Sequence, residues 1–165
     1  MRHQPSRSLF CFFCLILFAG CASTPLPDLN HEERAAVEQQ VRDFLGKYRA
    51  AIESRQIEAL RALYVNDDRF AWFEDGSERY STPNDVVQAL SALPQNMSLH
   101  TEYSGTRVLV LSRDLAMVRS SFQTRLGEAG QEGFSFGGAM TMLVERDPEG
   151  WKIVSGHTST ARPRQ

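Results

Sequence analysis

Cysteine is scarce in this sequence, and the few cysteines lie in one short stretch. Cys11, Cys14 and Cys21 are the only three in 165 residues, so no position after 21 carries a thiol. A domain built from the rest of the chain can therefore form no internal disulfide, and an oxidising compartment cannot cross-link it wrongly.

An excess of basic residues is also missing. The chain has 18 Lys and Arg against 20 Asp and Glu, and two of the basic residues precede position 21, which leaves 16 basic against 20 acidic. Nucleic-acid binding needs a basic surface, so this balance argues against a nucleic-acid partner. The sequence contains no phosphate-binding loop, nucleophile elbow or heptad repeat either.

Long hydrophobic runs are limited to one, from Leu9 to Gly20. As a helix it would reach roughly 18 Å, well short of the ~30 Å hydrocarbon core, so it is too short to span a bilayer comfortably. Arg2 and Arg7 precede the run without any acidic residue, and small residues end it. This order is the layout of a secretory signal peptide.

The end of the run, Leu17-Phe18-Ala19-Gly20-Cys21, resembles the lipobox of bacterial lipoproteins. The resemblance implies that residues 1–20 are a lipoprotein signal peptide, and that Cys21 is the lipidation site that anchors the mature protein to a membrane. Residues 21–31 would be the lipidated cysteine and a flexible tether. Because no Asp follows Cys21, the same analogy implies the outer membrane, facing the periplasm. An ordinary signal peptide and an uncleaved anchor are the alternatives.

Helical patterns dominate the first half of the remaining chain. Asn30 is an N-cap candidate, and apolar positions recur at spacings of three and four over 37–52, which predicts a long amphipathic helix. A shorter stripe over 57–64 predicts a second helix. Thr82 and Pro83 begin a third, which Pro94 ends.

Strand patterns follow. The Asp75-Gly76 pair between aromatic residues predicts a β-hairpin. From position 97 the apolar period changes to two, and short turns separate four runs, at 97–111, 114–126, 132–145 and 151–159. Short turns favour antiparallel neighbours. We expect the long strands to form a curved sheet, with bulges at Gly105, Gly137 and Gly138. The fold class is α+β.

Two segments carry a family resemblance. "AIESRQIEALRALYVNDDRFAWF" and the closing "GWKIVSGHTST" resemble the nuclear transport factor 2 and SnoaL-like superfamily, over roughly residues 33 to 160. The resemblance implies a cone-shaped nuclear transport factor 2-like domain at 32–160, with three N-terminal helices packed on a curved antiparallel sheet, and a disordered tail at 161–165. It also implies a tendency to form homodimers.

His157 is the first candidate pocket residue. Strand alternation would place Ser155, His157 and Ser159 on one face with Ile153. In the resembling branches this His lines or borders the mouth of the cone, where imidazole could bind a ligand or transfer protons. The alternative is a partly buried His that bonds to a neighbouring hydroxyl or carbonyl.

The other candidates have structural alternatives too. His100 and Glu102 share a strand face and could join His157 at a site, but nothing in their spacing enforces a metal centre, and we expect no metal and no cofactor. Trp72 and Tyr80 resemble the aromatic rim of the cone, and Met140 suits the wall of a hydrophobic pocket. Core packing is the default explanation for all three.

Three functions remain in competition. The favoured one is a lipid-anchored envelope protein whose cone binds a small, partly hydrophobic molecule or a peptide without turning it over. Another is a dimeric assembly module that uses its outer sheet face. The alternative from a different class is an enzyme of the isomerase, dehydratase or cyclase type, with His157 as proton shuttle assisted by Glu102 or Tyr80.

Overall fold

The structure, a computed structural model, describes residues 29–128 and 133–161. The predicted signal peptide, the Cys21 lipidation site, the tether up to residue 28 and tail residues 162–165 lie outside the described residues. Within the described ranges, no helix has an apolar stretch long enough to cross a bilayer.

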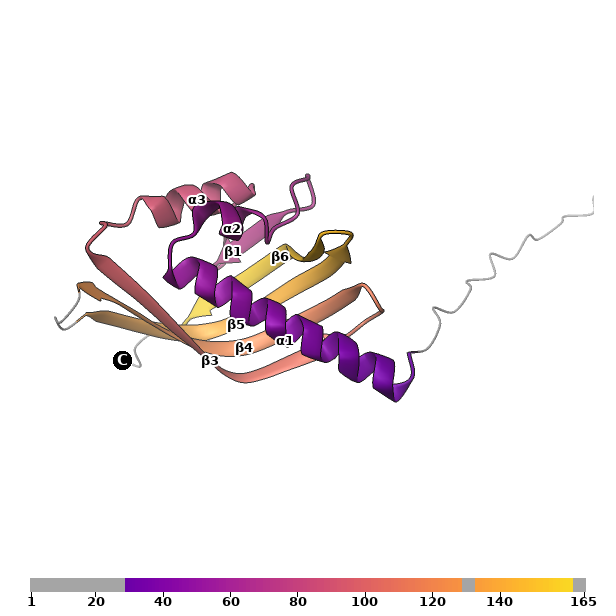
Figure 1. Cartoon of the computed structure of the whole chain (residues 1–165). Coiled ribbons are helices and arrows are strands. Elements are labelled where there is room, and N and C mark those ends of the chain that lie inside the picture. The colour runs from indigo at the N-terminus through magenta and orange to yellow at the C-terminus, as the bar shows by residue number, and fades with distance from the viewer. Residues whose placement is uncertain (1–28, 129–132, 162–165) are drawn as a thin grey trace, which may run out of the picture.

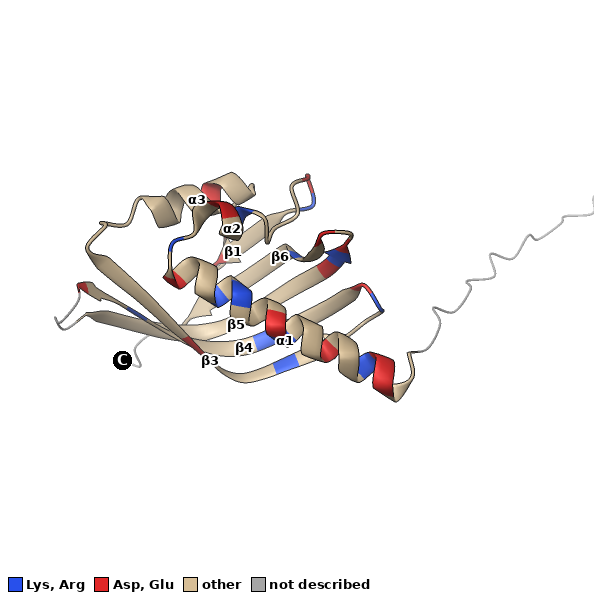
Figure 2. Ribbon diagram, in the orientation of Figure 1, with Lys and Arg blue, Asp and Glu red and all other residues tan. Residues whose placement is uncertain are grey.

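In the described part of the chain, three helices form where the sequence patterns predict them. They are α1 (His31–Glu53), α2 (Ile57–Arg61) and α3 (Pro83–Ser91). Asn30 caps α1 through a capping box, because its side chain accepts from the Glu33 N–H and the Glu33 carboxylate accepts from the Asn30 N–H. Thr82 caps α3 in the same way with Asp85. The long helix has charged residues of both signs along it (Figure 2).

Six strands of the same ranges form one sheet. They are β1 (Ala71–Glu74), β2 (Ser77–Tyr80), β3 (Met97–Val110), β4 (Leu115–Glu128), β5 (Phe134–Asp147) and β6 (Gly150–Thr160). The spatial order is β2-β1-β6-β5-β4-β3. The sheet is curved and open, and α1 crosses its concave face, while α2, α3 and the β1–β2 hairpin gather near one end of that helix (Figure 1). The predicted α+β cone fold is confirmed.

One strand pair differs from the antiparallel sheet predicted. β1 and β6 run parallel, with Trp72 opposite Gly156 and Phe73 opposite His157. Turn length fixes the direction of consecutive strands only. β1 and β6 are neighbours in the sheet but are separated by most of the domain in the sequence. No turn signal therefore constrains their relative direction.

Bulges interrupt two of the long strands. In β3 the register shifts between Ser104 and Arg107, around Gly105 with φ +62°, as predicted. Gly137 and Gly138 pair in unbroken register with β4, so the prediction of bulges there is wrong. The second bulge is at the Ile153-Val154 step of β6, because Val144 faces Ile153 while Leu143 faces Ser155.

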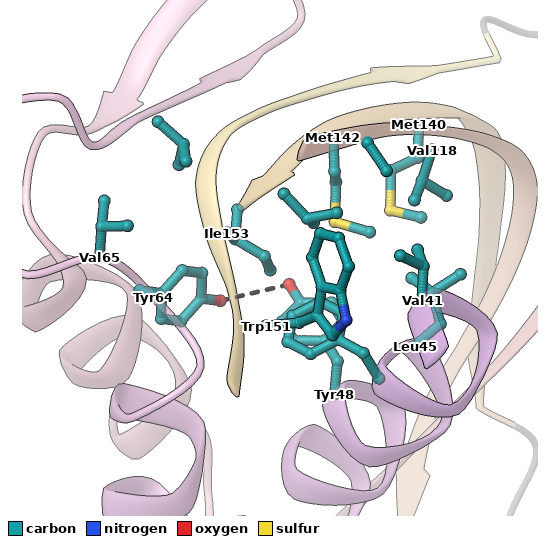
Figure 3. Close-up of a cluster of buried hydrophobic side chains, with 14 of the residues drawn as sticks. Val41, Leu45, Tyr48, Tyr64, Val65, Val118, Met140, Met142, Trp151 and Ile153 are labelled. Carbon is teal, nitrogen blue, oxygen red and sulfur yellow. Dashed lines mark hydrogen bonds between the residues drawn. The ribbon is translucent and has the colours of Figure 1, made fainter. Parts of the chain in front are cut away.

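The core is concentrated over one half of the sheet. Val41 and Leu45 of α1 pack towards Met142 and Ile153, and Trp151 lies beside them (Figure 3). Val41, Met142 and Ile153 have no exposed surface. This half of the cone is filled by side chains.

Charged side chains cap the edge strand β3. The Arg34 guanidinium donates to the Val110 carbonyl at 2.9 Å, and the Glu53 carboxylate accepts from the Thr101 N–H at 2.8 Å. Because an unpaired strand edge exposes backbone donors and acceptors, these contacts from both ends of α1 protect the edge and fix the helix across the sheet.

Candidate functional site

The other half of the cone is hollow. A cavity of about 390 Å³ lies between the C-terminal part of α1, helix α3, the β1–β2 hairpin and the inward faces of β3 to β6. Its deep lining is buried, because Leu60, Tyr64 and Met140 are at most 4% exposed. Asp75 and Thr160 also line it but are exposed, so the cavity opens towards the hairpin and the end of β6.

Aromatic rings make up much of the wall. Tyr48 and Tyr64 meet edge to face, with ring centroids 6.1 Å apart, and Phe122 and Phe136 do so at 6.2 Å. Edge-to-face contact is one of the preferred arrangements of paired aromatic rings. The aromatic side chains that line the cavity are Tyr48, Tyr64, Trp72, Tyr80, Tyr103, Phe122 and Phe136.

Two hydroxyl pairs interrupt this apolar lining. The Tyr64 hydroxyl donates to the Tyr48 hydroxyl at 3.2 Å, where helix α1 meets the segment after α2 (Figure 3). The Thr101 and Thr124 hydroxyls are 2.9 Å apart across β3 and β4. Burial is the main cause that raises the pKa of Tyr48 and of Tyr64, so both phenols are neutral near neutral pH.

Tyr103 offers a further hydroxyl. Burial raises its pKa well above the ordinary range for tyrosine, so it also stays protonated. In the two described ranges its hydroxyl has no hydrogen-bond partner, although the ring lines the cavity. A bound oxygen or nitrogen atom would find a donor and an acceptor there.

Carboxylates are the only charged side chains that line the cavity within the described part of the chain, and they belong to Glu74 and Asp75. Asp75 already has a backbone partner, since its Oδ1 accepts from the Thr160 N–H at 2.7 Å. Glu74 has a distant partner, with 3.9 Å between its Oε2 and the Nε of Arg79. Burial raises the pKa of Glu74 more than Arg79 lowers it.

A glycine positions the indole beside these carboxylates. Trp72 is opposite Gly156 in the parallel β1–β6 pair, and a Cβ at position 156 would overlap the six-membered ring of the indole. The absent side chain lets the ring lie against β6, with Trp72 only 6% exposed. Trp72 and Glu74 then share the inward face of β1.

The structure brings three of the predicted pocket residues together. Trp72, Tyr80 and Met140 all line the cavity. The other predicted residues belong to β6 and β3 and lie outside its lining, for a different physical reason in each strand.

His157, Ser155 and Ser159 lie outside the cavity lining, and His157 is exposed. The bulge at Ile153-Val154 is the cause. Both of its residues are buried, so the alternation shifts by one, and Thr158 and Thr160 turn inward instead. The prediction that Ile153 shares a face with His157 is therefore wrong, and this His is not placed to act on a molecule in the cavity.

His100 and Glu102 lie on the outward face of β3, with side chains 62% and 74% exposed. His100 contacts Glu53 at 3.1 Å and Glu102 at 3.6 Å, and it does not approach His157, because β4 and β5 lie between their strands in the sheet. The described residues hold no group of three or more His, Cys, Asp and Glu side chains placed to bind a metal.

The sequence patterns did not single out the hydroxyls. Tyr48 was indistinguishable from the other apolar positions of its helix, and Tyr103 and Thr101 alternate with polar neighbours as any half-buried strand does. One signal was available for β6. Ile153-Val154 is a pair of adjacent apolar residues in an alternating strand, which is the pattern that a bulge produces.

Fold and cavity together define an α+β domain of the cone-shaped kind, hollow in one half. The chain belongs to the family described as "SnoaL-like domain", whose model matches residues 41–163. No curated protein matches the chain.

Solved structures agree with this assignment. A candidate scytalone dehydratase of Novosphingobium aromaticivorans superposes with a TM-score of 0.70 at 14% identity, over 79% of this chain and 88% of that one. The hexachlorocyclohexane dehydrochlorinase LinA-type3 of Novosphingobium barchaimii gives 0.66 at 15%, over 81% and 92%. A nuclear transport factor 2-like protein of Salmonella enterica gives 0.67 at 11%, over 79% and 95%. At such identities the likeness shows the fold.

Proposed function

We propose that this domain binds one small, largely apolar ring-containing molecule in its cavity. The observation that carries the proposal is the buried aromatic lining interrupted by hydroxyls. A cavity of about 390 Å³ is near the lower end of the ~300–1,000 Å³ typical of small-molecule sites, which suits a molecule of one or two rings. The hydroxyls would fix its orientation.

A neutral fluorescent ligand tests this proposal. N-phenyl-1-naphthylamine becomes emissive in apolar surroundings, and we expect saturable binding of one molecule per chain. The protein should be held in amphipol or nanodiscs, because detergent itself would occupy an apolar cavity, and the emission of the probe with the empty carrier is subtracted.

A matched pair of variants locates the binding. Ala89 of α3 lines the cavity, so Ala89→Phe should fill it and abolish probe binding. Ala36 is exposed on α1, so Ala36→Phe adds the same ring without touching the cavity. Binding that is absent from the unsubstituted protein, or that survives Ala89→Phe unchanged, would contradict the proposal.

An isomerase or dehydratase is the second candidate, and one observation favours it. Glu74 is a cavity carboxylate whose pKa burial raises, which is a property of general bases and acids. Such an enzyme would use Glu74 with the hydroxyl of Tyr103 in place of His157. Turnover of the bound molecule that Glu74→Gln abolishes and His157→Ala preserves would establish it.

Lipid anchoring and dimerisation complete the proposal. The mature chain would begin at an acylated Cys21, be tethered to the outer membrane and face the periplasm. Intact-mass analysis of the protein from its host tests this, since Cys21→Ser should retain residues 1–20 and lose the acyl mass.

Two exposed apolar side chains favour a homodimer through the outer sheet face. Leu109 is 56% exposed, and it lies opposite Met117, which is 37% exposed. Native mass spectrometry should give a dimer that Leu109→Asp dissociates. A monomer at micromolar concentration would refute this part.

A further inference from the structure

The cavity has a marked charge asymmetry. Within the described residues, its lining contains two carboxylates and no Lys, Arg or His side chain. An anionic ligand would lose its hydration and meet no opposite charge, which is costly in a partly buried site. The lining therefore disfavours carboxylates, phosphates and sulfates as ligands.

Aromatic rings surround the remaining space, and their faces carry partial negative charge. A cation held over such faces is attracted by the ring quadrupole, and cages of several rings are the recurring way in which proteins hold organic ammonium groups. Trp72 pairs with Tyr80 across the hairpin, and Glu74 lies two positions after Trp72 on the inward face of β1. Rings and carboxylate thus converge on one side of the hollow.

The field of Glu74 extends into the cavity. Burial is the main cause that raises the pKa of Tyr48 and of Tyr80, and the Glu74 charge adds to the rise at both. The hollow from Tyr80 to Tyr48 therefore lies within reach of a negative charge.

The chain already places one of its own cationic side chains beside Tyr80 and Glu74. The Arg79 guanidinium carbon lies 5.7 Å from the centroid of the Tyr80 ring, and its Nε is 3.9 Å from the Glu74 carboxylate. Arg79 is 63% exposed and does not line the cavity. Its contacts show that this rim accommodates a cation between ring and carboxylate, while no cationic side chain of the described residues lies on the interior side of Glu74.

We propose that the molecule bound in the cavity is an organic cation, an amine or quaternary ammonium attached to an apolar group, held between Glu74 and the rings of Trp72 and Tyr80. This inference rests on the proposed binding function and adds the charge of the ligand to it. The apolar part fills the hollow under α3, and the ammonium lies at the hairpin.

Two compounds of the same shape distinguish the effect of ligand charge on binding from the effect of ligand size. Benzyltrimethylammonium and neopentylbenzene differ only in a nitrogen cation that replaces a quaternary carbon. Each is titrated against protein loaded with N-phenyl-1-naphthylamine. We expect the cation to displace the probe with a Kd at least about tenfold lower than the neutral isostere, and benzoate not to displace it.

Two variants should change the affinity for the cation in opposite directions. Glu74→Gln keeps the shape of the side chain and should weaken the cation about tenfold, while the neutral isostere changes less than about twofold and so reports an intact cavity. Arg79→Gln removes the competing positive charge and should tighten the cation several-fold. Asp75 is left unchanged, because it accepts from the backbone of β6.

The outcomes are distinct. If neopentylbenzene binds as tightly as the cation or more tightly, or if benzoate binds best, the charge inference is overturned and the proposed binding function stands. A cation that binds well but is unaffected by both variants also overturns it. If the neutral probe and both isosteres fail to bind, the proposed function itself is wrong.

Discussion

Gly156 offers the sharpest test of how the cavity wall is built. A Cβ at this position would overlap the indole of Trp72, and the rigid ring has no flexible end that could move aside. Either the indole leaves its place or β1 shifts along β6. Forcing extra atoms into a packed site costs ~1–3 kcal/mol, and the lower chain entropy of unfolded Ala returns ~0.4–1 kcal/mol of that. We expect Gly156→Ala to lower the free energy of unfolding by about 1–2 kcal/mol.

Gly46 supplies the matched control. It lies in α1, is exposed, and has no other atom within 4 Å of the place that a Cβ would occupy. Gly46→Ala removes the helix penalty of glycine and should raise the free energy of unfolding by about 0.5–1 kcal/mol. The same substitution is thus predicted to lower the free energy of unfolding at position 156 and to raise it at position 46.

Urea unfolding followed by circular dichroism measures both variants, and tryptophan fluorescence, to which Trp72 and Trp151 both contribute, reports a change around the indole. The slope with denaturant should match the unsubstituted protein, so that the midpoints compare stability alone. A Gly156→Ala protein as stable as Gly46→Ala, with unchanged fluorescence, would refute the contact between Trp72 and β6 and the cavity wall that depends on it.

Three further predictions concern caps, hydroxyls and charge. Asn30→Ala removes the capping box of α1 and should cost about 1 kcal/mol of stability in urea unfolding. Thr101→Val and Thr124→Val should each cost about 1 kcal/mol, and the double variant should cost less than their sum, since neither hydroxyl is then left unpaired. Because burial raises the pKa of Glu74, its contribution to stability is full below the ordinary glutamate pKa and is lost as the pH rises through the raised value; Glu74→Gln should remove this component of the pH profile.

Much of the fold was predictable because local signals agreed with it. Asn30 and Thr82 start helices where their capping partners follow, and Asp75-Gly76 turns the hairpin with positive φ at both residues. The long strands begin and end within a few residues of the predicted bounds, since turn residues interrupt a period of two.

The candidate site was less predictable because one extra residue in a strand moves every later side chain to the opposite face of the sheet. Val154 adds a single residue to β6, and every side chain after it changes sides. Thr158 therefore occupies the face that His157 was expected to have. The parallel pairing of β1 with β6, which sets Trp72 against Gly156, is a long-range contact that no local pattern specifies.

The hollow and the filled half of the cone share the inward face of one sheet. Over the filled half β5 contributes the buried residues Met142 and Val144, whereas over the hollow half Thr124 of β4 and Phe136 of β5 line open space. Unfilled space forfeits packing contacts, so a cavity lowers stability. Ala89→Phe should consequently stabilise the free domain while it abolishes ligand binding. A variant that loses binding and also loses stability would mean that α3 is packed more tightly over the sheet than the cavity implies.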